Sequence, residues 1–205
     1  MRRITLLYED HADPSGNVTN FGPHNLLVLC ALDDLRESGA QAVDYYTARR
    51  ERLVGVPKNG NSKLRAECRR LGATLARGGS PVIAVYDLDK VHHMITDVAV
   101  RQRHCKREMR ELFQGEGDAK DLLHVCFLDR NTETLTDIVA QILNCPQSGK
   151  PSPAERDSLL MAVAQYCDPA ALEQRRELRR RVASFDYIVR RVGRLARPLL
   201  VLSET

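Results

Sequence analysis

Two kinds of apolar pattern alternate along the first 145 residues. Short runs rich in Val, Ile and Leu have the length of β-strands, and longer segments repeat apolar residues every three or four positions, as helices with one buried face do. The strand-like runs are Ile4–Tyr8, Ala42–Thr47, the run within Pro81–Lys90, and Leu122–Leu128. The helical segments are Asn25–Glu37, a segment from a cap at Asn61 or Ser62 through Leu75, Thr96–Phe113, and a segment that contains Leu135 and Ile142. This alternation predicts an α/β fold: a Rossmann-like, mostly parallel four-stranded sheet with flanking helices.

The pattern changes after residue 145. Residues 146–153 contain three prolines and a glycine, which regular elements do not tolerate, so we expect a linker there. Two helical segments follow, one from Pro153 to about Tyr166 and one from Asp168 to Arg197. The chain is therefore expected to comprise an α/β domain at 1–145, a linker at 146–153 and a basic helical extension at 154–205.

Charge adds a candidate partner to this picture. The net charge is only +4, but arginines concentrate in the last third of the chain. Those expected to lie off the apolar stripe of the final helix are Arg175, Arg176, Arg179, Arg180, Arg190, Arg191 and Arg194. Because Arg matches phosphate geometry, we expect nucleic acid to bind there; an acidic partner protein and a simple solvated face are the alternatives. The low aromatic content and the absence of Trp argue against a stacking platform for single strands.

The cysteines and the apolar runs indicate the cellular compartment in which we expect the protein. The six cysteines form no Cys-x-x-Cys pair, and Cys68, Cys105 and Cys126 fall in apolar helical or strand patterns, so we expect reduced thiols. No apolar run approaches the ~18 residues that cross a bilayer. We therefore expect a cytoplasmic protein with no membrane partner.

Carboxylates gather where the predicted strands end. Asp87 and Asp89 close the third strand, and side chains two positions apart point to the same side of an extended chain. Parallel strands end at one edge of a sheet, where ligands of such sheets bind. Carboxylate oxygens are the ligands that Mg²⁺ prefers. The sequence thus predicts a divalent-cation site at this edge, where the carboxylates are Glu9 and Asp10, Asp87 and Asp89, and Asp129 and Glu133.

A Glu after the first strand, an Asp-x-Asp after a later strand and a further Glu after the next resemble the TOPRIM (topoisomerase and primase) domain. More narrowly, residues 3–143 resemble the TOPRIM-like nucleases of the overcoming-lysogenization-defect type and related bacterial defence proteins. The resemblance implies that Glu9 transfers protons or binds metal, that Asp87 and Asp89 are catalytic metal ligands, and that Glu133 is an additional ligand. It also implies Mg²⁺ or Mn²⁺ as cofactor and a nuclease or phosphodiesterase activity on nucleic acid, in bacterial defence.

The sequence departs from the TOPRIM pattern at two positions. TOPRIM domains commonly place Gly after the first Glu and shortly after the Asp-x-Asp, where this chain has Asp10 and Lys90. Two interpretations follow: a bulky residue obstructs the close approach of phosphate, or Lys90 and His92 themselves bind phosphate. The departures leave open a non-catalytic Rossmann-like interaction module or a subunit of a defence or toxin complex. A phosphatase of the haloacid-dehalogenase type, with Asp87 as nucleophile, is disfavoured because that pair usually follows the first strand.

Overall fold

The computed structural model describes residues 3–9, 22–75, 79–88, 94–113, 122–128, 132–145 and 151–202. Its centre is a four-stranded, all-parallel sheet with the strand order β2-β1-β3-β4. The strands are β1 (Ile4–Tyr8), β2 (Leu53–Pro57), β3 (Val82–Asp87) and β4 (Leu123–Leu128). Tyr8 lies beside Val85, and Asp87 lies beside Leu128. The predicted parallel α/β sheet is confirmed.

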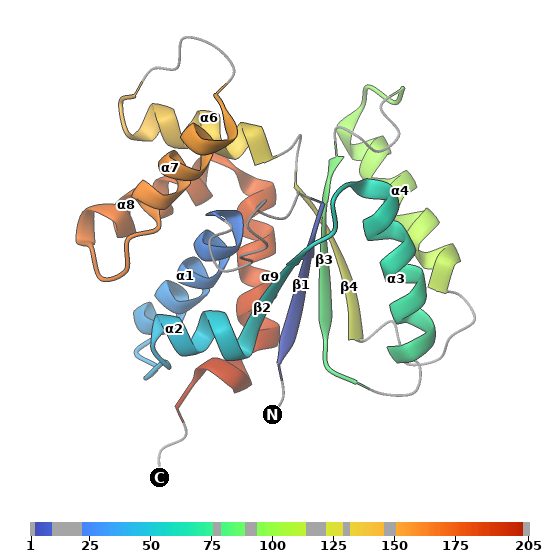
Figure 1. Cartoon of the computed structure of the whole chain (residues 1–205), viewed down its shortest axis with the longest axis horizontal. Helices are drawn as coiled ribbons and strands as arrows, with labels where there is room; N and C mark the ends of the chain where they lie inside the picture. Colours follow the sequence, from blue (N-terminus) through green and yellow to red (C-terminus); the bar gives the residue numbers. More distant parts are fainter. Residues whose placement is uncertain are drawn as a thin grey trace.

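Helices cover both faces of the sheet (Figure 1). Helices α3 (Asn61–Leu75) and α4 (Val98–Phe113) cover one face, where they share a core with Leu7, Ala84 and Tyr86. The other face carries α1 (Gly22–Glu37), α6 (Thr132–Ile142), α7 (Pro153–Val163), α8 (Pro169–Arg181) and α9 (Ala183–Leu200). Alternation along the strands divides the core in this way, because successive side chains point to opposite faces.

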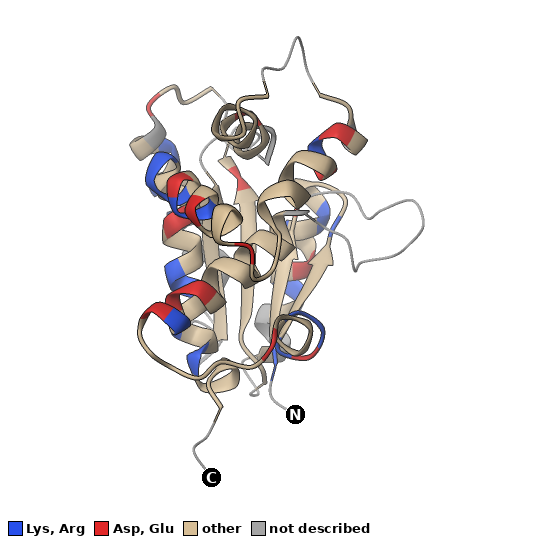
Figure 2. Ribbon diagram, turned by 90° about the vertical axis from the view of Figure 1, so that its left-hand side faces the viewer, with Lys and Arg blue, Asp and Glu red and all other residues tan. Residues whose placement is uncertain are grey.

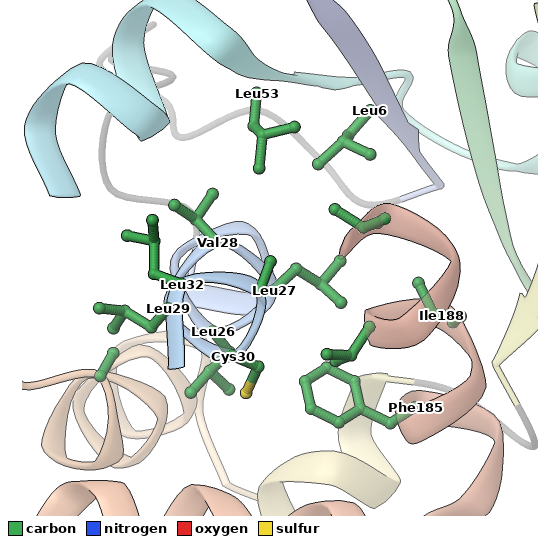
Figure 3. Close-up of a cluster of buried hydrophobic side chains, with 14 of the residues drawn as sticks. Leu6, Leu26, Leu27, Val28, Leu29, Cys30, Leu32, Leu53, Phe185 and Ile188 are labelled. Carbon is green, nitrogen blue, oxygen red and sulfur yellow. The ribbon is translucent and has the colours of Figure 1, made fainter. Parts of the chain in front are cut away.

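Helix α1 is buried on all sides rather than on a single stripe (Figure 3). Leu6 and Leu53 of the sheet lie on one side of it, and Phe185 and Ile188 of α9 lie on another. An unbroken apolar stretch, residues 26–32, makes this possible, because a helix that is apolar all round needs neighbours all round. The sheet alone could not cover α1.

The C-terminal helices supply that cover. Val163 of α7, Leu178 of α8 and Val189 of α9 belong to the same buried cluster as Ile4 of β1 and Leu29 of α1. Helices α7 to α9, which belong to the part of the chain expected as an extension, therefore pack as part of the helical layer on the α1 face of the sheet.

The second strand is not where the sequence placed it. Ala42–Thr47 was predicted to be a strand, but Asp44 accepts hydrogen bonds from the backbone N–H groups of Tyr46 and Thr47 and so begins the short helix α2 (Tyr45–Thr47). A π-helical turn (Ala48–Arg52) follows, and β2 begins at Leu53. Capping by Asp44 thus outweighs the strand propensity of the two tyrosines.

The long final helix is also different from the prediction. It divides at Val182, whose φ of −122° and ψ of 84° are not helical, so α8 and α9 are separate helices. Helix α9 then continues through Pro198 to Leu200. The break allows Arg179 of α8 and Asp186 of α9 to form an ion pair of 2.7 Å between Nε and Oδ1.

The cysteine prediction holds for the described residues. All six thiols are unbridged, and Cys30, Cys68, Cys105 and Cys126 are buried. Burial raises the pKa of the Cys30 thiol to about 12, so this side chain behaves as a small apolar group. Among the described helices, none is long and apolar enough to cross a membrane.

Candidate functional site

The strand order places the candidate site between β1 and β3. From β1 the chain crosses to β2 on one side, and it then passes back over β1 to reach β3 on the other side. Ligands of open parallel sheets bind beyond the C-terminal strand ends at such a reversal. The residues that stand there are Glu9, directly after β1, and Asp87, at the end of β3.

Glu9 and Asp87 are 78 positions apart in the sequence and adjacent in space. The backbone N–H of Asp87 donates a hydrogen bond of 3.2 Å to Oε2 of Glu9. Both residues are buried, with exposed fractions of 4% and 5%. The residues after the first strand and at the end of the third therefore lie side by side, and this contact joins the carboxylate of Glu9 to the backbone of Asp87.

The loop after β2 fixes the position of Glu9. The N–H of Lys58 donates to the carbonyl of Tyr8 at 2.8 Å, and the N–H of Gly60 donates to the carbonyl of Glu9 at 2.6 Å. Gly60 has a φ of +108°, which only glycine adopts readily. Because α3 begins at the next residue, its N-terminus lies against the Glu9 backbone.

A small cavity of about 20 Å³ adjoins the pair. Its polar lining consists of Tyr8, Glu9 and Asp87, and its apolar lining comes from Pro23, Leu27, Val85, Leu128, Leu135, Phe185 and Ile188. A space of this size holds one water molecule or one ion. A nucleotide does not fit, so a larger ligand would have to approach from the strand-end edge.

Burial makes the charge of this pair costly. A carboxylate that is removed from water loses hydration, and polar or positively charged partners must make up for this loss. The N–H of Asp87 is one such partner for Glu9. A divalent cation is another kind of partner, and carboxylate oxygens are suitable ligands for it.

The remaining predicted ligands are not seen at this pair. Asp10, Asp89, Lys90, His92 and Asp129 lie outside the described residues. Glu133 is in the first turn of α6, and its side chain also lies outside the described part of the chain. Among the residues that are described, no group of three or more His, Cys, Asp or Glu side chains converges as a metal site.

Sequence reasoning missed a polar pair behind the carboxylates. Tyr8, which lines the cavity, has its hydroxyl oxygen 3.2 Å from Nδ1 of His24 in α1. Gly55 of β2 makes room for this imidazole, since a Cβ there would lie 2.7 Å from the ring. The sequence signal that could have pointed to Tyr8 was its position directly before Glu9. The role of Gly55 in making room for His24 depends on the pairing of β2 with β1, which the sequence does not show.

We expect His24 to make the protein acid-sensitive. Burial, with the positive charge of Arg49 as a smaller cause, lowers the pKa of His24 from 6.5 to about 4. Between pH 6.5 and pH 4, His24 is therefore protonated in the unfolded chain but mostly neutral in the folded chain. The free energy of unfolding should fall by about 3 kcal/mol as the pH decreases from 6.5 to 4. Urea unfolding across this range measures the loss.

A His24→Gln variant should lose most of this pH dependence, whereas His104→Gln, on the surface helix α4, should retain it. An NMR titration of the His24 ring in the wild-type protein measures its pKa directly, without a variant. A midpoint near 6.5 in the folded protein would contradict the argument.

One of the arginines predicted to bind nucleic acid has a structural role instead. Arg175 is only 2% exposed, and its Nε and Nη2 donate to the two carboxylate oxygens of Asp33 in α1 at 2.7 and 3.2 Å. Its Nη1 donates to the carbonyls of Val163 and Gln165. Buried in this way, Arg175 cannot reach a phosphate, and the prediction for this residue is wrong.

The other predicted arginines of α8 and α9 have partners of their own in most cases. Arg176 pairs with Glu37 and Glu173, Arg179 with Asp34 and Asp186, Arg180 with Glu177, and Arg190 with Asp186. Arg191 donates to Nδ1 of His124 at 2.9 Å, and Arg194 is exposed. Figure 2 shows the resulting mixture of basic and acidic residues along these helices. Acidic residues of α1, which the sequence pattern did not connect with these arginines, balance much of their charge.

Comparisons with known proteins add no identification. A scan against protein-family models found no matching family, and searches of curated proteins and of solved structures found no match either.

Proposed function

We propose that this protein is a divalent-metal-dependent phosphodiesterase that cleaves nucleic acid. The observation that carries the proposal is the convergence of Glu9 and Asp87 at the reversal point of a parallel sheet, where the N–H of Asp87 donates to Glu9. Two buried carboxylates at a ligand-binding edge favour a cation, and a cation beside carboxylates supports phosphodiester hydrolysis. The TOPRIM resemblance of the motifs agrees with this function, and a role in bacterial defence extends the same proposal.

In this proposal, Glu9 and Asp87 hold the ion, and Asp89 joins them by its place two residues after Asp87 in the sequence. Mg²⁺ or Mn²⁺, when bound, would supply charge neutralisation on the phosphate and a more acidic water molecule. Glu9 is also the candidate to accept a proton from that water, because its carboxylate lies at the cavity. Lys90 is the proposed phosphate contact next to the pair, and Glu133 a proposed outer ligand.

The direct test is cleavage of supercoiled plasmid DNA and of labelled DNA and RNA strands by the purified protein. Cleavage should require Mn²⁺ or Mg²⁺ and stop when EDTA is added. Titration calorimetry with Mn²⁺ alone should show a site that the Asp87→Asn variant lacks. Failure to cleave any of these substrates, together with no Mn²⁺ binding, would reject the proposal.

A second candidate is an interaction module without turnover, in a defence or toxin complex. The specific observation in its favour is the small cavity, which takes an ion or a water but leaves no room for a nucleotide among the described residues. In that case the wild-type protein would bind Mn²⁺ or a partner protein and leave every nucleic acid substrate intact.

A further inference from the structure

The two helical layers of the protein carry very different charge. Helices α3 and α4 together contain nine basic and three acidic residues. The five helices on the opposite face, α1 and α6 to α9, contain eleven basic and ten acidic residues. Among these seven helices, α3 and α4 therefore carry most of the excess positive charge, and the arginine-rich C-terminal helices are close to balanced by their neighbours.

The only acidic residue of α3 is already paired. Glu67 accepts hydrogen bonds from Arg70 at 2.8 Å and from Lys58 at 3.0 Å, and these cations hold its pKa at about 2. By contrast, Lys63 and Arg69 are exposed and form no ion pair with any described residue. Arg103 of α4 is also exposed, and its Nε makes a single long hydrogen bond of 3.4 Å to the carbonyl of Ala99. This surface therefore has more positive charge than its own acidic residues can neutralise.

The composition of the surface suits a phosphate backbone. Seven of its nine basic residues are arginines, whose planar guanidinium groups match phosphate oxygens. Aromatic side chains for stacking unpaired bases are nearly lacking, because α3 has none and α4 has only Phe113, at its last position. A paired, double-stranded backbone fits this surface better than a single strand does.

The same surface adjoins the strand-end edge. Helix α3 begins directly after Gly60, whose N–H binds the carbonyl of Glu9. In the first turns of α4, Arg101 donates to the carbonyl of Leu88 at 3.2 Å, one residue beyond Asp87. A duplex lying along the two helices would thus reach the edge at which the two carboxylates stand.

We propose that the outer surface of α3 and α4, centred on Lys63, Arg69 and Arg103, binds the sugar–phosphate backbone of double-stranded nucleic acid. The claim that this surface holds the substrate rests on the proposed phosphodiesterase function. The claim that it binds duplex does not require cleavage. Binding in EDTA therefore tests it separately from cleavage.

The experiment measures fluorescence anisotropy of a labelled DNA duplex of about 20 base pairs, in EDTA, from about 50 to 200 mM salt. The Arg69→Glu/Arg103→Glu variant should bind at least about 10-fold more weakly than wild type and show a smaller salt slope. The matched control is Arg180→Glu/Arg190→Glu, which makes the same charge change at exposed positions of α8 and α9 and should alter affinity less than about 3-fold. Melting temperatures verify that both variants fold.

If Arg69→Glu/Arg103→Glu does not fold, Arg69→Gln/Arg103→Gln replaces it and should still weaken binding about 3-fold or more. An equal or larger loss in the control variant would place the duplex on the C-terminal helices and overturn the proposal. So would a wild-type protein that fails to bind duplex at low salt, or that binds a single strand of the same sequence more tightly. Normal duplex binding without cleavage would leave this surface supported and reject only the proposed catalysis.

Discussion

The Asp87→Asn variant is expected to lose metal-dependent cleavage by a factor of at least about 100 while remaining folded. Asparagine preserves the shape of Asp87 and leaves its backbone N–H in place, so the hydrogen bond to Glu9 should persist. The change removes one negative charge from a buried pair, and without metal the melting temperature should stay equal or rise. Cleavage rates and thermal unfolding, each with and without Mn²⁺, measure both effects.

Asp137→Asn is the matched control, because Asp137 is an exposed carboxylate on α6 that does not line the cavity beside Glu9 and Asp87. It should cleave as the wild-type protein does. Wild-type protein should gain thermal stability from Mn²⁺, whereas Asp87→Asn should gain much less. An Asp87→Asn protein with full activity would remove Asp87 from the proposed site, whatever its stability.

Replacing Arg175 with methionine is expected to lower the free energy of unfolding by about 3–5 kcal/mol. The substitution leaves the carboxylate of Asp33 buried with its guanidinium partner removed, and it takes a donor away from the carbonyls of Val163 and Gln165. These contacts join α1, α7 and α8, so the loss should reach the whole helical layer. Urea unfolding followed by circular dichroism measures it.

The double variant Asp33→Leu/Arg175→Met separates pairing from packing. Removing both charges should recover much of the loss, since an apolar pair in a buried position often costs little relative to an ion pair. Arg180→Met, at a side chain that is 69% exposed, should change the unfolding free energy by less than about 0.5 kcal/mol. A loss below about 1 kcal/mol for Arg175→Met would show that this ion pair contributes little.

Prediction from sequence succeeded where one local signal dominated. The continuous apolar run from Val82 to Val85 identified β3, and parallel geometry then placed Glu9 and Asp87 at one edge. The second strand failed because two signals competed: tyrosines favoured a strand at Ala42–Thr47, while Asp44 supplied a helix cap. The short β2 contains Gly55, which weakens a strand pattern and which is required by the His24 ring.

The role of Arg175 could not be read from its own helix. Its partner Asp33 is 142 positions earlier, so helical periodicity placed the arginine on an outward face. The informative residue was Asp33 itself, because a carboxylate directly after the apolar stretch of α1 is costly unless a cation reaches it. Tertiary packing, rather than local pattern, decides which arginines remain at the surface.

The dependence of α1 on α9 has a consequence for folding during synthesis. All four strands and α1 precede α9 in the chain, but α9 covers part of the apolar surface of α1. While a ribosome is still extending the polypeptide, Leu27 and its neighbours remain without this cover until α9 has emerged. A nascent chain stalled before Ala183 should therefore expose an apolar surface of the kind that chaperones bind.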